Sequence, residues 1–230
     1  MTCPFCFSKH SKLLRMGEPQ EVFDRLNIVG GGSRECVCPT CFSLDRERLV
    51  YVYLVDYFKV FKRSNLHILH IAPERNIYHF LSKAYLPSYL AGALYGSQYP
   101  FVKDFLTIDI TGTQFPDDSF DLIICNHVLE HIPEESSALN EIWRILKVGG
   151  EAILQVPIAY GMDKTLEDPT ITTPSERLRQ YGQKDHVRLY GCDYQQRLSN
   201  HGFDVGKYSL AEEYPLLGLN KEEILYVARK

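Results

Sequence analysis

The sequence predicts an α/β fold with a largely parallel sheet, preceded by a small metal-binding module. One observation predicts the sheet. From residue 66 onward, short apolar runs alternate with longer mixed stretches, and strands separated by helices in this way form parallel sheets with covered faces. A second observation, two matched Cys-x-x-Cys pairs within residues 1–42, predicts the module.

The first element is the cysteine module. Cys3 and Cys6 form one pair and Cys38 and Cys41 the other, each with two intervening residues and a proline after the first cysteine. Two such turns can present four thiolates to one tetrahedral zinc ion. The alternatives are two disulfides, which a reducing compartment disfavours, or four unused thiols. We predict a structural Zn²⁺ and take residues 1–42 as a zinc ribbon too small to fold without its ion.

Other side chains are weaker candidates for this metal site. Cys36 could replace Cys38, but Cys38 keeps the matched two-residue spacing. His10 is a weaker substitute. We expect Cys125 and Cys192 to be ordinary buried or half-buried thiols.

The second element is a helix over residues 43–63, which links the ribbon to a domain over residues 64–230. The segment contains neither glycine nor proline, and Ser43 could cap its start. Apolar residues recur near helical spacing. They are Leu49, Val52, Tyr53, Leu54, Phe58 and Phe61.

The domain over residues 64–230 contains seven candidate strands and an amphipathic helix. The helix covers residues 134–150, and we expect Gly149–Gly150 to end it. Its apolar face consists of Leu139, Ile142, Trp143 and Leu146. The candidate strands are residues 66–72, 88–95, 105–110, 120–127, 151–157, 202–210 and 222–229.

Composition and charge narrow the function. Hydrophobic residues make up 45% of the 230 positions, and the formal net charge is −4. This balance argues against a surface dedicated to nucleic acid, although it leaves room for a local basic patch. No apolar run approaches the ~20 residues of a membrane helix, and the N-terminus lacks a signal-peptide core. We expect a cytoplasmic protein with no membrane partner, and the oligomeric state stays open.

Several motifs in the second half carry a family resemblance. Residues 107–114 (TIDITGTQ), 115–133 (FPDDSFDLIICNHVLEHIP) and 141–157 (EIWRILKVGGEAILQVP) resemble class I S-adenosylmethionine (SAM) dependent methyltransferases. Val148 stands where proline is commoner in that family. The resemblance implies a Rossmann-like sheet with a reversed last strand, SAM as cofactor, and methyl-transfer activity.

Two further segments narrow the resemblance. Residues 38–48 (CPTCFSLDRER) and 182–194 (GQKDHVRLYGCDY) are similar to a group of small, mostly bacterial methyltransferase-like proteins with an N-terminal zinc ribbon. The second segment lies in an insertion, residues 158–194, which follows the fifth strand. A segment in that place is expected to cover the substrate.

The resemblance implies a cofactor-binding turn after the first strand. The family's Asp-x-Gly-x-Gly positions fall on His70, Ala72 and Glu74, and the zinc-ribbon group shares this glycine-free form. Ala72 still allows a close approach of the backbone, and Pro73 suits the first helical position. Glu74 could accept the ammonium group of SAM. The alternative is that this segment is simply a buried strand and the start of a helix.

The next strand departs from the family pattern. The acidic residue that usually binds the ribose hydroxyls falls on Ala93, with Tyr95 and Gln98 as the nearest substitutes. If no other group replaces this carboxylate, its loss would cost ~1.5–3 kcal/mol of cofactor-binding free energy. The chain could therefore bind SAM weakly, use another ribose partner, or have lost the activity.

The remaining cofactor positions follow the third and fourth strands. The resemblance places Asp109 and Ile110 at the adenine edge and Asn126 and His127 beside the sulfonium. The alternative for Asp109 is an ordinary turn residue. We take His131, in the common Leu-Glu-His pattern, as mainly structural.

Candidate catalytic and substrate residues come from two segments. His127 and His186 are the best candidate bases because histidine titrates near neutral pH. The insertion is rich in polar groups, and the alternative is a loop that hydrogen-bonds to itself. The candidate substrate residues are Asp185, His186, Arg188, Tyr190 and Tyr194.

Three functions fit these observations. The first is a SAM-dependent methyltransferase with a small polar acceptor, such as a sugar or glycan precursor, in which an oxygen or nitrogen is methylated. The second is an RNA methyltransferase with the ribbon as reader, which the nearly balanced charges of the ribbon disfavour. The third is a non-catalytic binding protein, which Ala93 supports.

Overall fold

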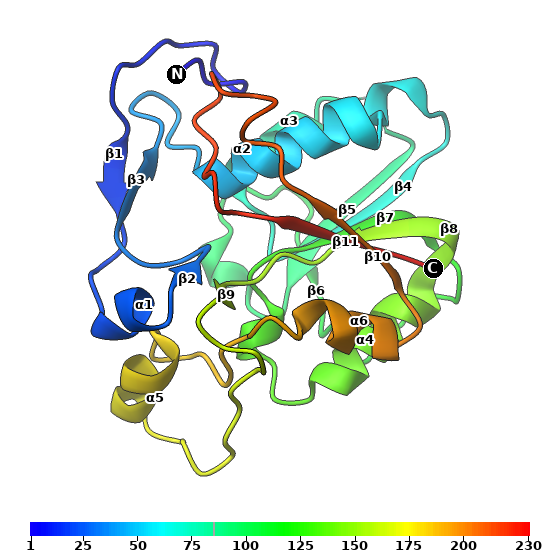
Figure 1. Cartoon of the computed structure of the whole chain (residues 1–230). Helices are drawn as coiled ribbons and strands as arrows, with labels where there is room; N and C mark the ends of the chain where they lie inside the picture. Colours follow the sequence, from blue (N-terminus) through cyan, green and yellow to red (C-terminus); the bar gives the residue numbers. More distant parts are fainter. Residues whose placement is uncertain (85) are drawn as a thin grey trace.

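A computed structural model of the chain describes residues 1–84 and 86–230. Seven strands form one sheet in the order β10-β11-β8-β7-β4-β5-β6. The strands from β8 to β6 run parallel, and β11 runs antiparallel to both β8 and β10. The mostly parallel sheet and its reversed last strand are therefore confirmed (Figure 1). The strands are β4 (His67–Ile71), β5 (Ser88–Ala93), β6 (Leu106–Thr107), β7 (Phe120–Cys125), β8 (Leu146–Ile153), β10 (Asp204–Tyr208) and β11 (Leu225–Arg229).

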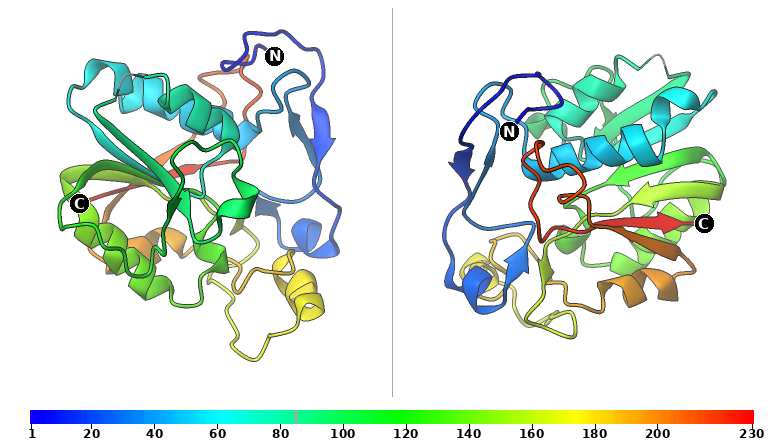
Figure 2. Two further views of the ribbon diagram at one scale, coloured as in Figure 1. Left: turned by 180° about the vertical axis from the view of Figure 1, so that it is seen from behind. Right: turned by 45° about the horizontal axis from the view of Figure 1, so that its top comes forward.

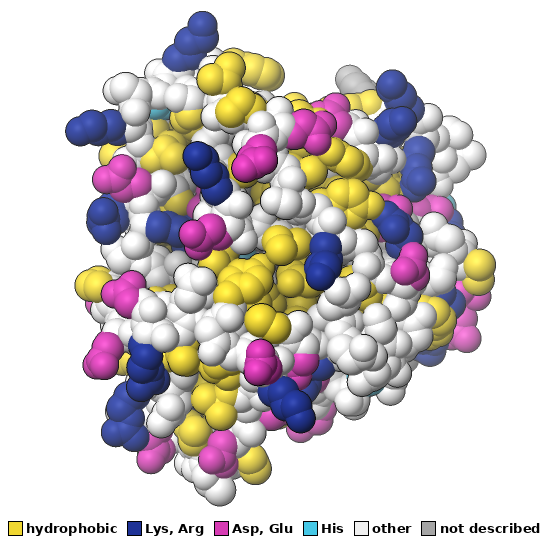
Figure 3. All heavy atoms as spheres, in the orientation of Figure 1, with side chains coloured by type: hydrophobic (Ala, Val, Ile, Leu, Met, Phe, Trp, Pro, Cys, Tyr) yellow, Lys and Arg dark blue, Asp and Glu magenta, His cyan; other side chains and the backbone are white. Residues whose placement is uncertain are grey.

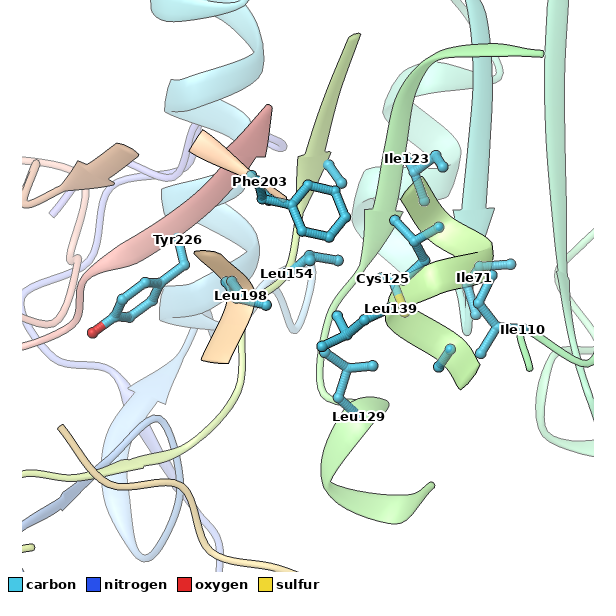
Figure 4. Close-up of a cluster of buried hydrophobic side chains, with 14 of the residues drawn as sticks. Ile71, Ile110, Ile123, Cys125, Leu129, Leu139, Leu154, Leu198, Phe203 and Tyr226 are labelled. Carbon is cyan, nitrogen blue, oxygen red and sulfur yellow. The ribbon is translucent and has the colours of Figure 1, made fainter. Parts of the chain in front are cut away.

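Helices cover both faces of the sheet (Figures 1 and 2). Neighbouring residues of a strand point to opposite faces, so β7 supplies both cores. Leu122 and Ile124 pack under α2 and α3, whereas Ile123 and Cys125 pack under α4 (Figure 4). The covering helices are α2 (Asp45–Val52) and α3 (Arg75–Leu81) on one face, and α4 (Glu135–Ile145) and α6 (Tyr194–Asn200) on the other.

The N-terminal segment packs against two later parts of the chain. Strand β1 (Leu14–Met16) pairs with β3 (Arg34–Val37), as expected of a ribbon. Strand β2 (Ile28–Val29) instead pairs with β9 (Ile158–Ala159) at the start of the insertion. Two short helices join this contact through a shared apolar cluster. They are α1 (Glu21–Arg25) and α5 (Pro174–Tyr181).

The linking helix is shorter than expected. Helix α2 continues as a π-helical turn, Tyr53–Tyr57, and the chain then passes Lys59 (φ +57°) into a 3₁₀ turn. The prediction that Ser43 could cap this helix is wrong. Its hydroxyl lies 3.3 Å from the Cys3 sulfur, and the carboxylate of Glu47 accepts the Leu44 N–H instead. Phe61, which the sequence pattern placed on the apolar face of this helix, is 59% exposed.

The end of α4 also differs from the prediction. The helix stops at Ile145, and Gly149–Gly150 lie inside β8, which begins at Leu146. The helix ends at Ile145 because the next residues pair with β7. Leu146 lies opposite Phe120, and the register shifts before Glu151. The left-handed conformation of Gly149 (φ +75°) accommodates this irregularity.

Charged side chains of both signs are interspersed over the face shown in Figure 3. Among the described residues, no helix combines the length and the apolar character that crossing a bilayer would take.

Candidate functional site

The turn after β4 has an unusual backbone. Ala72 adopts φ +49°, in the left-handed region that favours glycine. Its N–H donates to the carbonyl of Gly92 on β5, at 2.8 Å, which holds the turn against the carboxyl edge of the sheet. Helix α3 then begins at Arg75, so Pro73 precedes the helix rather than opening it. The conformation that the family's first glycine would adopt freely is thus retained here by alanine.

Glu74 lies directly after this turn and is held from two sides. Its Oε2 is 2.9 Å from Nε2 of His70, and its Oε1 accepts from the Asn126 amide at 3.2 Å. Burial opposes the charge of Glu74, but the hydrogen bond and charge of His70 outweigh burial and lower the pKa of Glu74. The other ring nitrogen of His70 contacts the Tyr89 hydroxyl at 2.9 Å. His70 therefore positions an ionised carboxylate that suits a cationic amino group.

Two adjoining cavities lie along this edge of the sheet, with volumes of about 660 and 560 Å³. Ala72, Gln98, Tyr99 and His127 line both. Glu74 and Asn126 line the first cavity, and Ala93, Asp109 and Ile110 line the second. Residues expected at the cofactor site therefore converge here from four strand ends. His70 is the exception, because it is fully buried behind Glu74 and lines neither cavity.

The second cavity has an unusual ribose side. Ala93 ends β5 opposite Thr107, where the family pattern has a carboxylate. Tyr95 and Gln98 line the wall nearby, as the sequence suggested. Asp109 uses one oxygen to accept the N–H and hydroxyl of Thr111, at 2.9 and 2.6 Å. Asp109 is therefore both a turn residue and part of the cavity wall.

A cluster of histidines and carboxylates lies beside the second cavity. Nδ1 of His127 is 3.4 Å from Oε1 of Glu130, and Nδ1 of His131 is 3.3 Å from Oδ2 of Asp185. The rings of His131 and His186 meet edge to face, with centroids 4.7 Å apart. His131, which we expected to be mainly structural, and Asp185 both line the cavity.

Several polar atoms of this cluster are buried without a hydrogen-bond partner in the described part of the chain. They are Nε2 of His127, Oε2 of Glu130 and both ring nitrogens of His186. Burial lowers the pKa of His186 to about 4 and that of His127 well below its usual value, whereas it raises the pKa of Glu130 to about 8. The imidazoles are thus neutral at physiological pH.

Arg188 holds this cluster in place and is therefore not free for substrate. Its guanidinium donates to the carbonyls of Leu129, Ile132 and Pro133, at 2.7, 2.5 and 3.0 Å, and to the carboxylate of Glu167 at 3.0 Å. These bonds fix the turn that carries Glu130 and His131. Burial of the guanidinium therefore contradicts the prediction that Arg188 contacts the substrate.

Tyr190 and Tyr194 are likewise internal. Both are fully buried. The Tyr190 hydroxyl donates to Glu135 at 2.6 Å, and that of Tyr194 donates to the Leu154 carbonyl at 2.8 Å. Of the candidate substrate residues, Asp185 and His186 thus lie near the cavity. The other three, Arg188, Tyr190 and Tyr194, form hydrogen bonds inside the protein, which agrees with the alternative that this loop is held by its own hydrogen bonds.

The paired cysteines form a second candidate site. The sulfurs of Cys3, Cys6, Cys38 and Cys41 all lie within 4.8 Å of one another. Cys3 and Cys41 are 3.4 Å apart and Cys6 and Cys38 are 3.8 Å apart, close to the ~3.7 Å between thiolates on a tetrahedral zinc ion. These residues fit a zinc ion.

The two cysteine turns have the same backbone form. The N–H groups of Phe7 and Phe42, each directly after a second cysteine, donate to the carbonyls of Cys3 and Cys38 at 2.9 and 3.0 Å. Both phenylalanines are left-handed, with φ of +59° and +60°. His10 lies nearby, bonded to Ser8 and Thr40 at 3.0 Å each, outside the sulfur cluster.

The cysteine module forms part of the first cavity. Cys41, Phe42 and Arg46 line it together with Glu74 and His127. The Nε of Arg46 is buried without a hydrogen-bond partner in the described residues. Sequence reasoning missed Arg46, although it lies in the CPTCFSLDRER motif. A turn of the cysteine cluster and a half-buried arginine therefore share a wall with the expected cofactor site.

Comparison with known proteins agrees with this geometry. Residues 88–154 match the family described as a methyltransferase domain. An arsenite methyltransferase of Aquipseudomonas alcaligenes is 32% identical over 112 residues, 47% of this chain and 29% of that protein. The uncharacterized methyltransferase YcgJ of Bacillus subtilis is 34% identical over 104 residues, 44% and 39% of the two chains. The chain thus spans less than half the length of these curated relatives.

Solved structures show the same fold. A SAM-dependent methyltransferase from Archaeoglobus fulgidus has a TM-score of 0.52 at 13% identity, covering 80% of this chain and 94% of that one. The [4+2]-cyclase SpnF has a TM-score of 0.50 at 14% identity, covering 94% and 99%. The fold is therefore the Rossmann-like methyltransferase fold.

Proposed function

We propose that the chain is a SAM-dependent methyltransferase that acts on a small polar acceptor, and that its cysteine cluster holds a structural zinc ion. One observation carries the proposal. Ala72, Glu74, Asp109 and His127 meet along one pair of cavities at the carboxyl edge of the sheet, where ligands bind in folds of this type. The family match over residues 88–154 and the named methyltransferase relatives support it.

The residues that would hold SAM follow from charge and position. Glu74 offers an ionised carboxylate to the amino group, and the half-buried Arg46, whose Nε has no hydrogen-bond partner in the described residues, offers a cation to the carboxylate. Gln98 would contact the ribose in place of the missing acid, and Asp109 the adenine. When bound, SAM supplies a methyl group activated by its sulfonium.

His127 is the proposed base for the acceptor. It lines both cavities, and its Nε2 has no hydrogen-bond partner in the described residues. Its other nitrogen faces Glu130 at 3.4 Å, which orients the ring. Protein groups in such a reaction chiefly align the acceptor and take its proton. His186 is the second candidate for this role.

Beside the residues assigned to SAM, the second cavity is lined by His131 and Asp185 within a largely apolar wall, and these two side chains support a hydroxyl- or amine-bearing acceptor such as a sugar or glycan precursor. On the face shown in Figure 3, charges of both signs are interspersed, and this face gives an RNA acceptor no comparable support. Arsenite, the substrate in the name of one relative, is a useful member of an acceptor screen.

A second candidate is a non-catalytic binding protein, which the absent carboxylate at Ala93 favours. Calorimetric titration of the zinc-loaded protein with SAM and S-adenosylhomocysteine separates the two. Micromolar binding that Asp109→Ala weakens supports the methyltransferase. No binding at millimolar ligand, with the protein shown to be folded, would refute the cofactor assignment and favour the second candidate.

A further inference from the structure

Glu130, His131 and His186 form a compact set of metal-ligand types. Each offers one ligand atom, and the three atoms lie within 4.8 Å of one another. Two imidazoles and one carboxylate are a common set for divalent zinc, manganese and iron in proteins. Glu130 and His186 are 1% and 2% exposed. The His131 side chain is 33% exposed, so the set is buried on two sides and open at His131, and it shares no residue with the cysteine cluster.

The unpaired atoms of this set call for a partner. Oε2 of Glu130 and both nitrogens of His186 are buried with no hydrogen bond to the described chain. A buried polar group left unpaired costs ~1–3 kcal/mol, so three such atoms in one place are unusual for packing alone. A cation would satisfy Glu130 and one His186 nitrogen at the same time.

Neighbouring groups orient the proposed ligands. Oδ2 of Asp185 lies 3.3 Å from Nδ1 of His131 and would leave Nε2 of that ring for the ion. A carboxylate behind a histidine ligand is the usual supporting arrangement in metal sites. The Val187 N–H donates to the Glu130 carbonyl at 2.8 Å, and Arg188 clamps the same turn. Both segments that carry ligands are thus held rigidly before an ion binds.

We propose that Glu130, His131 and His186 bind a divalent metal ion of the manganese, iron or zinc class. Three protein ligands leave coordination positions open. Because His131 and Asp185 line the second cavity beside His127, an ion held here would lie next to that cavity, and its open positions would suit an oxygen of the acceptor. This last step rests on the proposed methyltransferase function, whereas the metal site itself does not.

The test uses Mn²⁺ on protein that holds one equivalent of zinc per chain, in the absence of SAM, so that the proposed site stays open. Mn²⁺ prefers oxygen and nitrogen ligands and does not compete for four thiolates, so the cysteine site stays filled. Calorimetry and the loss of the free Mn²⁺ EPR signal should both show one ion per chain. Glu130→Gln and His186→Leu should each weaken binding ~10-fold or more. The matched control is His201→Ala, whose ring bonds to Asn140 at 2.9 Å outside the cluster.

Thermal unfolding keeps the test decisive if a variant is perturbed. Mn²⁺ should raise the melting temperature of the wild type and of His201→Ala but not of His186→Leu. Asp185→Asn, at a side chain that is 70% exposed, should fold normally and weaken binding by a smaller factor. Absence of binding at 1 mM of Mn²⁺ and of Co²⁺ would overturn the proposal. So would binding that survives both ligand substitutions.

Discussion

Ala72 and His127 adopt the same left-handed backbone conformation, with φ of +49° and +53°, in the two turns that follow the neighbouring parallel strands β4 and β7. Both residues line both cavities. Non-glycine residues in this region carry strain that the surrounding structure must offset, and such residues cluster at binding sites. The pair therefore marks the part of the sheet edge that is held in a fixed shape for a ligand.

The first prediction concerns this strain. Ala72→Gly should leave the free energy of unfolding unchanged or raise it by up to ~1 kcal/mol, because relief of left-handed strain offsets the entropy that glycine gains in the unfolded chain. Ala72→Val should destabilise by ~2 kcal/mol or more, since a branched side chain is worse there. Urea denaturation measures both.

The matched control for Ala72 is Ala91→Gly. Ala91 is equally small and lies in β5 with an ordinary backbone, so glycine there should cost ~0.5–1 kcal/mol. Equal losses at positions 72 and 91 would contradict the strain argument.

The second prediction concerns the carboxylate of Glu74. Glu74→Gln keeps the shape, and its amide oxygen can still accept from Asn126 while its NH₂ faces Nε2 of His70. It removes the charge, so the affinity for SAM should fall ~10-fold or more. Calorimetry at fixed ionic strength gives the dissociation constants. Glu212→Gln, at an exposed glutamate, should leave the affinity unchanged. Equal affinity of wild type and Glu74→Gln would remove Glu74 from the cofactor site.

The third prediction links zinc to the cofactor. Because Cys41, Phe42 and Arg46 line the first cavity, loss of the proposed zinc should displace that wall. Chelation, or Cys38→Ser, should lower the zinc content and weaken SAM binding ~10-fold, a change of ~1.4 kcal/mol. Cys192→Ser, at an exposed thiol, is the control. Undiminished SAM affinity in zinc-free, folded protein would show that the module is independent of the site.

The central strands β4 and β7 were predictable because each alternates between two buried faces. Ile68 and Leu69 of β4 enter opposite cores, as do Leu122 and Ile123 of β7. This short-range pattern predicted strands over residues 66–72 and 88–95, close to the observed β4 and β5, and therefore placed Ala72 and Ala93 at the edge of the sheet. The end of α4 was not predictable in the same way, because a contact between Leu146 and Phe120 in a distant strand decides it.

The cluster around Glu130 was only half visible in the sequence. His186 and Asp185 lie more than 50 residues after Glu130, and Arg188 brings the segments together through bonds to backbone carbonyls. Any residue type can supply a carbonyl, so this contact leaves no signature in the sequence. For the same reason His131 was taken as structural rather than as a part of the cavity wall.

The fourth prediction concerns a buried carboxyl group, Glu223. Its Oε1 accepts from the Gln155 amide at 2.6 Å, and its Oε2 has no hydrogen-bond partner in the described residues. Burial, reinforced by the charge of Asp45, raises the pKa of Glu223 from 4.5 to about 7. The folded state therefore favours the neutral carboxyl. This contribution to stability is fully present below pH 4.5 and is lost as the pH rises through about 7.

The variant Glu223→Gln carries a neutral side chain at every pH. Its free energy of unfolding should therefore increasingly exceed that of the wild type as Glu223 of the wild type becomes ionised. At about 1.4 kcal/mol per pKa unit, the difference in the free energy of unfolding should approach ~3 kcal/mol by pH 8 and be small near pH 5. Urea denaturation at pH 5, 6, 7 and 8 measures it, with the exposed neighbour variant Glu222→Gln as control. A difference that stays constant over this range would mean that the folded protein holds Glu223 ionised throughout, with Arg34 or Arg46 compensating for its burial.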